Sequence, residues 1–227
     1  MKPIALITPV LTGLCMLLVS SCTSPRLERE LKDIPLGPSF QPDNVYAEPL
    51  SPDIRRVLVF PFHTQPDNQA EAATLEKAML PSLLSTGRFE VVTLERGEVM
   101  ELAGRPTFAS MDMIPPAVAA RLREQWRADA VLLTDITSYR PYKPFMLGVR
   151  SRLVSLRDQE VIWACDEVYD AGNEAVEVGA RRYAERYLEQ EYPLQRSYSV
   201  LISPRRFAAY VAHSLYSTLP EREPQEP

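Results

Sequence analysis

Between positions 53 and 136, short apolar runs alternate with segments of helical periodicity. Runs of adjacent apolar and β-branched residues predict buried strands, and here they occupy residues 55–62, 89–93 and 129–136. Apolar residues spaced three and four apart predict helices, one beginning near Asn68, a short one ending near Leu102, and one opened by Pro115-Pro116. This part of the chain therefore predicts alternating strands and helices.

After residue 136 the pattern changes to consecutive strands. Residues 146–157 and 160–169 are long extended runs joined by Asp158-Gln159, a connection short enough for a hairpin. Two helices follow, over residues 173–191 and from Ser203 onward, where Ser203 is the expected N-cap. The order βαβ(α)αβββαα predicts an α/β fold: a single domain with a mixed sheet of about five strands and helices packed on it.

The beginning of the chain has the pattern of an export signal. Lys2 precedes an uncharged stretch from Ile4 to Val19, which at about 16 residues is shorter than the ~20 that a membrane-spanning helix needs. The stretch ends in Leu18-Val19-Ser20-Ser21-Cys22. This resembles a bacterial lipobox, in which the signal is cleaved before a cysteine that is then acylated. We therefore expect a signal peptide over residues 1–21 and a lipid anchor on Cys22; the alternative is an ordinary signal peptide that contains a cysteine.

The residues after the cysteine favour one membrane over the other. Thr23 and Ser24 follow Cys22, without the Asp that in enterobacterial lipoproteins marks retention in the inner membrane. A multiply acylated cysteine is a stable anchor without a transmembrane helix. The expected location is the outer membrane, with the protein facing the periplasm.

Prolines define the segment that follows the anchor. Six prolines among residues 23–52 deny it helical and ladder hydrogen bonds, so we expect an extended tether over residues 22–52. The alternative is a coil packed along the domain surface, which the apolar residues in this segment favour: Leu36, Phe40, Val45 and Tyr46. Residues 220–227 are charged and proline-rich and are expected to form a disordered tail, which leaves residues 53–219 for the domain.

The net charge argues against nucleic-acid binding, and the cysteine content argues against an intramolecular disulfide and a nucleophilic cysteine. The formal net charge of −5 gives no broad positive field, so nucleic acid is not an expected ligand. Cys15 is lost with the signal and Cys22 is acylated, so Cys165 alone remains of the three cysteines and cannot form an intramolecular disulfide. Cys165 lies in an apolar run, which predicts a small buried side chain rather than a nucleophile.

Four stretches of the chain resemble a known family. They are residues 57–62, 87–92, 127–133 and 156–163, with the lipobox in addition. The stretches are similar to the lipoprotein superfamily that includes curli-export proteins, flagellar-assembly lipoproteins and outer-membrane activators of penicillin-binding proteins. The resemblance implies a non-enzymatic, anchored part of an envelope assembly, with a cell-wall synthase or a flagellar or export component as partner.

Two departures from the curli-export branch narrow the choice. Only residues 137–145 separate the strands where that branch inserts a long hairpin, and a helical pattern starts near Asn173 where it inserts another. A membrane-spanning strand needs ~9 to 11 residues in each leg, so a pore-forming role has little room.

Candidate catalytic residues are few. The chain has two histidines and lacks H-E-x-x-H, paired cysteines, a Gly-rich phosphate loop and G-x-S-x-G. His63 follows a strand and is a candidate base, with a surface position as the alternative; His213 is expected on a helix surface. Asp166 and Glu167 are expected on opposite faces of a strand, which argues against a carboxylate pair there with Asp170. We expect no catalytic or metal site.

The segment from Tyr139 to Phe145 is the best candidate for recognition. It combines aromatic side chains, cations and prolines between two strands, with Tyr139, Arg140, Tyr142, Lys143 and Phe145 as the candidate partner-binding residues. The alternative is a rigid connector whose aromatic side chains pack back onto the core.

These observations predict a non-enzymatic outer-membrane lipoprotein that acts as an accessory or scaffold subunit of a cell-envelope assembly through protein contacts. No cofactor is expected beyond the covalent lipid on Cys22. The alternative is a homo-oligomeric ring or pore component of an export system, and a periplasmic hydrolase is the third interpretation.

Overall fold

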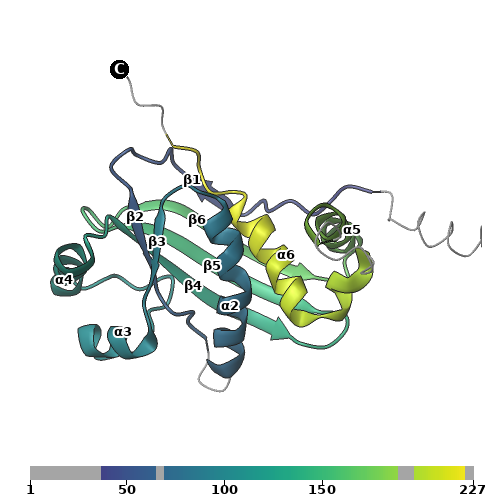
Figure 1. Cartoon of the computed structure of the whole chain (residues 1–227), viewed down its shortest axis with the longest axis horizontal. Coiled ribbons are helices and arrows are strands. Elements are labelled where there is room, and N and C mark those ends of the chain that lie inside the picture. Colours follow the sequence, from purple (N-terminus) through teal and green to yellow (C-terminus); the bar gives the residue numbers. More distant parts are fainter. Residues whose placement is uncertain (1–36, 65–68, 189–196, 223–227) are drawn as a thin grey trace, which may run out of the picture. The chain divides into compact units, whose positions relative to one another are not determined.

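The computed structural model describes residues 37–64, 69–188 and 197–222, which belong to one compact unit, Pro35–Pro227. A six-stranded mixed sheet has the order β1-β6-β5-β4-β2-β3 (Figure 1). The strands are β1 (Val45–Ala47), β2 (Arg56–Val59), β3 (Glu90–Thr93), β4 (Ala130–Arg140), β5 (Met146–Ser155) and β6 (Val161–Asp170). The helices are α2 (Gln69–Ser85), α3 (Arg96–Ala103), α4 (Pro116–Trp126), α5 (Glu174–Tyr183), the π-helical turn η2 (Ala184–Leu188), the 3₁₀ helix η3 (Ser197–Ile202) and α6 (Pro204–Tyr216). The predicted α/β fold is confirmed, with one strand more than expected.

The sheet joins a parallel part to an antiparallel part. β2 pairs in parallel with β3 and with β4, and helices carry the chain back between these strands. β4, β5 and β6 pair antiparallel in chain order, and the hairpin predicted at Asp158-Gln159 is present, with Gln159 at a φ of 63°. The change from alternating to consecutive strands in the sequence therefore matches the change from parallel to antiparallel pairing.

β4 is longer than the apolar run that predicts it. It continues to Arg140 through a register shift between Ile136 and Ser138, so the strand contains a bulge. Gly148 on β5 lies against the bulge, where a Cβ atom would collide with the hydroxyls of Thr137 and Ser138. A larger residue at this position would have to displace these hydroxyls, and the backbone nitrogen of Ser138 lies only 3.1 Å from the Cβ position.

The additional strand comes from the segment predicted as a tether. Val45–Ala47 forms β1 and pairs antiparallel with β6, opposite residues 163–165. The buried Glu167 carboxylate accepts the backbone N–H groups of Asp43 (2.7 Å) and Asn44 (2.8 Å). Residues 37–52 therefore contact the domain, as the alternative interpretation of this segment has it. The rest of the predicted tether and the predicted signal peptide lie outside the described residues.

The start of the predicted disordered tail is also bound. The Arg222 guanidinium donates to the backbone carbonyls of Pro52 (3.0 Å), Ile54 (2.9 Å) and Arg88 (2.7 Å). Arg222 also forms an isolated bridge to Leu50. It is therefore part of the domain, and the prediction of a disordered tail over residues 220–227 was wrong for this residue. Residues 223–227 lie outside the described part.

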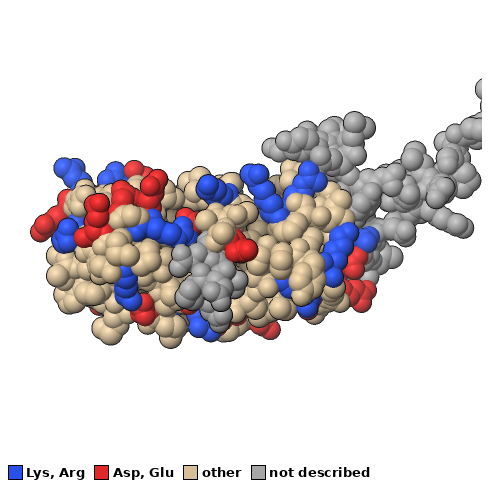
Figure 2. All heavy atoms as spheres, turned by 90° about the horizontal axis from the view of Figure 1, so that it is seen from below, with Lys and Arg blue, Asp and Glu red and all other residues tan. Residues whose placement is uncertain are grey.

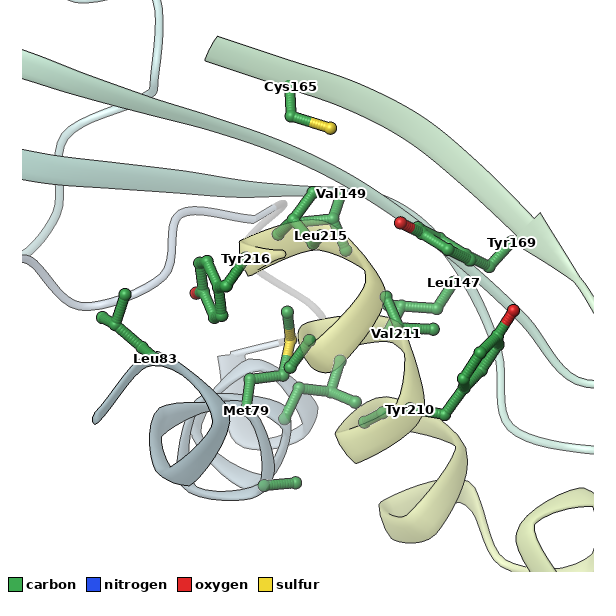
Figure 3. Close-up of a cluster of buried hydrophobic side chains, with 14 of the residues drawn as sticks. Met79, Leu83, Leu147, Val149, Cys165, Tyr169, Tyr210, Val211, Leu215 and Tyr216 are labelled. Carbon is green, nitrogen blue, oxygen red and sulfur yellow. The ribbon is translucent and has the colours of Figure 1, made fainter. Parts of the chain in front are cut away.

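One face of the sheet is covered by α2 and α6, which lie side by side (Figure 3). Met79 and Leu83 of α2, Val211 and Leu215 of α6, and Leu147 and Val149 of β5 fill the space between the layers, and each is at most 1% exposed. α2 continues through Pro81. α6 begins as predicted, with the Ser203 hydroxyl accepting the Arg206 N–H.

α3 and α4 cover part of the opposite face. Their apolar side chains pack against alternate residues of β2 and β4, and this second cluster includes Leu58, Phe60, Leu122, Val131 and Leu133. α4 begins at the predicted proline pair and ends at Arg127, which has a left-handed φ of 53°. The sheet therefore has a core on each face.

The helix predicted over residues 173–191 is regular only in its first part. α5 ends at Tyr183 and continues as the π-helical turn η2, and residues 189–191 lie outside the described residues. Cys165 is 1% exposed, and burial raises the pKa of its thiol to about 12, which confirms the prediction of a buried structural cysteine. None of the described helices is long and apolar enough to span a membrane.

Candidate interaction surface

On the sheet face that carries α3 and α4, these helices cover β2 and β4. No described helix lies over the corresponding face of β5, β6 and β1, and the side chains that alternate onto it form what we call the open sheet surface: Tyr46, Arg150, Arg152, Ala164, Asp166 and Val168. Tyr46 is 48% exposed and Val168 is 51% exposed. Exposed apolar side chains thus lie on a part of the sheet that the described helices do not cover.

One ion pair and one hydrogen bond to a backbone carbonyl hold the arginines of this surface. The Arg150 Nε lies 2.6 Å from an Asp166 carboxylate oxygen. Arg152 donates to the carbonyl of Ser110 at 3.0 Å and lies 3.6 Å from the Met111 sulfur. The Glu167 side chain contacts the chain before β1, on the other face of β6, so the predicted separation of Asp166 and Glu167 is confirmed.

A rigid loop borders the open sheet surface. The Asp135 carboxylate, 8% exposed, accepts the backbone N–H of Ser110 at 2.7 Å and its hydroxyl at 2.5 Å. Asp112 accepts the N–H of Ala109 (3.0 Å) and a guanidinium N–H of Arg105 (2.8 Å). These contacts fix the backbone of the loop that carries Met111 and Met113.

The two exposed methionines of this loop are Met111 and Met113, at 62% and 81% exposure. We call residues 109–113 the methionine loop. Met111 also lines a hollow of about 320 Å³ on the open sheet surface, together with Tyr46, Arg150 and Arg152. Neither methionine was predicted as a contact from the sequence, although two methionines that flank an aspartate shortly before a proline pair are a usable signal.

The predicted recognition segment divides into buried and exposed residues. Phe145 is 4% exposed and packs against Phe207, with ring centroids 5.8 Å apart, and the half-buried Tyr139 packs on the same core. Arg140 donates to the Pro144 carbonyl at 2.5 Å and to Asp170 at 2.8 Å. Tyr142, 69% exposed, and Lys143 point to solvent. Of the five candidates, Tyr142 and Lys143 are accessible to a partner, whereas Phe145 belongs to the core.

The two histidines have structural contacts. His63 continues the pairing of β2 with β4 through backbone hydrogen bonds to Thr134 and Ile136, and its Nδ1 lies 3.0 Å from the Thr107 hydroxyl. His213 is half-buried rather than on the helix surface, because the rings of Tyr183 and Tyr187 lie 5.2 and 4.7 Å from its ring. Among the described residues, no group of three His, Cys, Asp or Glu side chains could hold a metal ion.

Charge is evenly distributed on the side of the molecule shown in Figure 2. Acidic and basic side chains are interspersed there, and most of the visible surface carries neither. This agrees with the absence of a broad positive field in the composition.

The architecture defines an α/β protein whose mixed sheet is covered fully on one face and partly on the other. No family model matches the sequence, and no curated protein matches it significantly. Three similar solved structures each have a TM-score below 0.5. The PelC dodecamer from Paraburkholderia phytofirmans has a TM-score of 0.47 and 13% identity, over 78% of this chain and 96% of that one. Lipoprotein GNA1162 from Neisseria meningitidis has a TM-score of 0.41 and 20% identity, over 61% of this chain and 99% of that one. The LpoB C-terminal domain from Salmonella enterica has a TM-score of 0.35 and 16% identity, over 52% of this chain and 83% of that one.

Proposed function

We propose that this protein is an outer-membrane lipoprotein, anchored through Cys22 and facing the periplasm, that acts as an accessory or scaffold subunit of a cell-envelope assembly by protein contact. The open sheet surface is the observation that carries the proposal. It combines exposed apolar side chains with arginines, and aromatic, Met and Arg side chains are the types enriched in protein interfaces.

The backbone of this surface needs little ordering on binding. The methionine loop is held by the Asp135 and Asp112 carboxylates, and Tyr46 lies on a strand paired to β6. Binding costs less free energy when the contact residues are already fixed, because less conformational entropy is lost. The surface therefore favours a specific partner over nonspecific adhesion.

The number of residues before the first described residue limits how far the domain lies from its proposed anchor. Because residues 37–52 contact the domain, only the chain from Cys22 to Gly37 separates the proposed lipid from the first described residue. At the ~3.1 to 3.6 Å per residue of an extended chain, this segment spans at most about 50 Å. Gly37, where the described chain begins, therefore lies within that distance of the anchor. A cell-wall synthase or a flagellar or export component is the class of partner that the family resemblance suggests.

The experiment is capture of partners from the native host. The tagged full-length protein is crosslinked in the periplasm, and the captured proteins are compared with those of Val168→Glu. Leu84→Glu is the matched control, because Leu84 is 52% exposed on α2, on the other side of the sheet. We expect Val168→Glu to lose an envelope partner that Leu84→Glu retains. Equal capture by both variants would contradict the proposal.

The second candidate is a homo-oligomeric component of an export system. The two outer strands, β1 and β3, each pair on one side only among the described residues, and a free strand edge is a template for pairing with another chain. Light scattering of the full mature chain with Cys22→Ser distinguishes the two. A high-order mass supports the oligomer, and a monomer supports the accessory subunit.

A further inference from the structure

The two ends of the sheet expose different side chains. At one end Arg140 of β4 pairs with Met146 of β5, next to the loop over residues 141–145, and at the other end Ala130 pairs with Ser155. β4 has 11 residues at about 3.3 Å each, so about 30 Å separates the two ends. We call the end with residues 141–145 the turn end and the other, which holds the connection from β5 to β6, the hairpin end.

The start of α6 also lies at the turn end. Phe207, in the first turn of α6, packs against Phe145 beside the loop. Beyond the other end of α6, the Thr218 hydroxyl accepts the Nε1–H of Trp163 at 3.0 Å, and Trp163 pairs with β5 near the hairpin end. α6 therefore runs from the turn end toward the hairpin end, and the residues just before it are at the turn end.

Two protrusions of the turn end each combine an apolar or aromatic side chain with a cation. Tyr142, 69% exposed, is followed directly by the exposed Lys143. Ile202, 50% exposed, precedes the exposed Arg205 by three residues. The same combination thus occurs twice, on two segments that are far apart in the chain.

The turn end has an excess of positive charge, although the chain as a whole is acidic. α5 begins at this end, because a Cβ atom on Gly172 would lie 3.6 Å from Pro144. Residues 139–145, 170–188 and 197–206 contain seven Lys and Arg and four Asp and Glu, in a chain of net charge −5. The hollow at the hairpin end is instead lined by five carboxylates and two arginines: Glu48, Asp53, Asp129, Asp158 and Glu160, with Arg123 and Arg157. A partner that matches the turn end is therefore anionic.

The described chain begins beside the same end. The Gly37 carbonyl and the Ser39 hydroxyl each accept a hydrogen bond from Arg182 of α5 at 2.9 Å, and Figure 1 shows this start of the described chain next to α5. Only residues 23–36 lie between Gly37 and the proposed lipid on Cys22. A short connection raises the effective concentration of the membrane at this end of the domain, which favours a membrane over a soluble acidic partner.

We propose that the turn end docks on an anionic phospholipid surface. Lys and Arg side chains near such a surface are attracted to its headgroups, tyrosine suits the boundary between headgroups and acyl chains, and an exposed Ile adds buried apolar area. A bilayer surface needs no matching groove, so protruding side chains fit it. The proposal rests on the proposed function for the lipid anchor, whereas the contact itself does not require the lipid.

Docking at the turn end also leaves the proposed partner site accessible. The strands run from the turn end to the hairpin end, so with the turn end on the membrane they extend away from it. The open sheet surface lies along β5 and β6 and therefore stands beside the membrane, where an envelope protein can reach it.

The test is co-sedimentation of the full mature chain with phospholipid vesicles. Cys22→Ser removes the proposed acylation site, so that binding reports the protein surface alone. Vesicles of phosphatidylglycerol are the anionic probe, and vesicles of phosphatidylcholine carry no net charge. The test variant combines Lys143→Glu with Arg205→Glu. Its matched control combines Arg123→Glu with Arg157→Glu, which reverses two exposed arginines at the hairpin end.

A second pair of variants tests the apolar contribution. Ile202→Ser is the test variant and Leu84→Ser the control, because the two side chains are 50% and 52% exposed and Leu84 lies on α2. Both substitutions shorten an exposed side chain without changing the charge.

We expect binding to phosphatidylglycerol vesicles, a loss of about tenfold or more for the charge reversal at the turn end, and a loss of about threefold for Ile202→Ser. The controls should change the affinity by less than about twofold, because charges about 30 Å from the membrane are screened. Absence of binding to phosphatidylglycerol, equal losses in test and control variants, or equal binding to both lipids would overturn the proposal.

The competing occupant is an acidic protein. Capture of one protein by a photoreactive amino acid at position 142 in the native host, together with no binding to vesicles, would overturn the proposal in favour of that occupant. The vesicle assay uses neither acylation nor another protein. Its failure therefore leaves the accessory function standing, and a failure to capture a partner at the open sheet surface leaves the membrane contact standing.

Discussion

The covered and the open parts of one sheet face follow the same alternation and carry different side chains. Under α3 and α4, the positions that point to this face are apolar, as in Leu58, Val131 and Leu133. On β5 and β6, where no described helix lies above, the equivalent positions include Arg150 and Asp166. Apolar side chains therefore occupy the part of the face that the described helices cover, and charged side chains occupy much of the part that they leave exposed.

Tyr46 and Val168 depart from that rule. Each is apolar or aromatic and about half exposed in the open part, next to charged neighbours. An isolated exposed apolar side chain needs no explanation, but Tyr46 lines the same hollow as the exposed Met111. The comparison separates residues that hold the fold from residues that are free for a partner.

The largest expected effect is in the covered part. Leu133→Ala removes a fully buried side chain and leaves a cavity, so we expect the free energy of unfolding to fall by about 2–5 kcal/mol, measured by urea denaturation. Val168→Ala in the open part should change it by less than about 0.5 kcal/mol. Similar losses in the two variants would remove the distinction between the two parts.

The next effect concerns the bulge that shapes the open part. Gly148→Ala places a Cβ atom against the hydroxyls of Thr137 and Ser138, and we expect a loss of about 1–3 kcal/mol in unfolding free energy. Gly97→Ala is the matched control, because it lies in α3 with nothing near its Cβ position, and it should stabilise by about 0.5–1 kcal/mol. A neutral result for Gly148→Ala would mean that the bulge relaxes freely.

The methionine loop gives the third test. Ser110→Ala removes a buried hydrogen bond to Asp135, and the carboxylate oxygen that loses its partner stays buried, which should cost about 1–3 kcal/mol. The free energy of unfolding measures the cost, and limited oxidation of Met111 and Met113 measures whether the loop loosens. Unchanged stability would show that the hydroxyl contact of Ser110 with Asp135 does not stabilise the loop.

The smallest effect is a pH dependence at His213. Burial lowers its pKa in the folded protein, so below the ordinary value of about 6.5 the unfolded chain binds a proton that the folded protein does not, and stability falls as the pH falls. We expect His213→Gln to lose less stability than the unchanged protein between pH 7.5 and 5.5, compared as urea midpoints. An equal loss in both proteins would mean that His213 does not contribute.

Local periodicity predicted most of the elements and some of the candidate site. The runs at 55–62 and 129–136 and the hairpin at Asp158-Gln159 depend on neighbouring residues, and all are present. β1 could not be predicted in the same way, because its three residues become a strand only by pairing with β6, more than a hundred residues later.

The candidate site shows the same division. The aromatic segment between two strands was a reasonable candidate for recognition. Whether each of its rings points outward depends on contacts with residues far away in the chain, which the local sequence does not show. Phe145 points inward because Phe207 of α6 lies beneath it, and Tyr142 points outward from the turn. The open sheet surface was missed because it exists only through the absence of a described covering helix over β5, β6 and β1.

The most direct test of the central claim is a photoreactive amino acid at position 168 of the full-length protein in its native host, with position 84 as the control. The account predicts that irradiation joins position 168 to one envelope protein and that position 84 gives no such product. Capture at position 84 but not at 168, or a ladder of self-crosslinked copies from position 168, would contradict it.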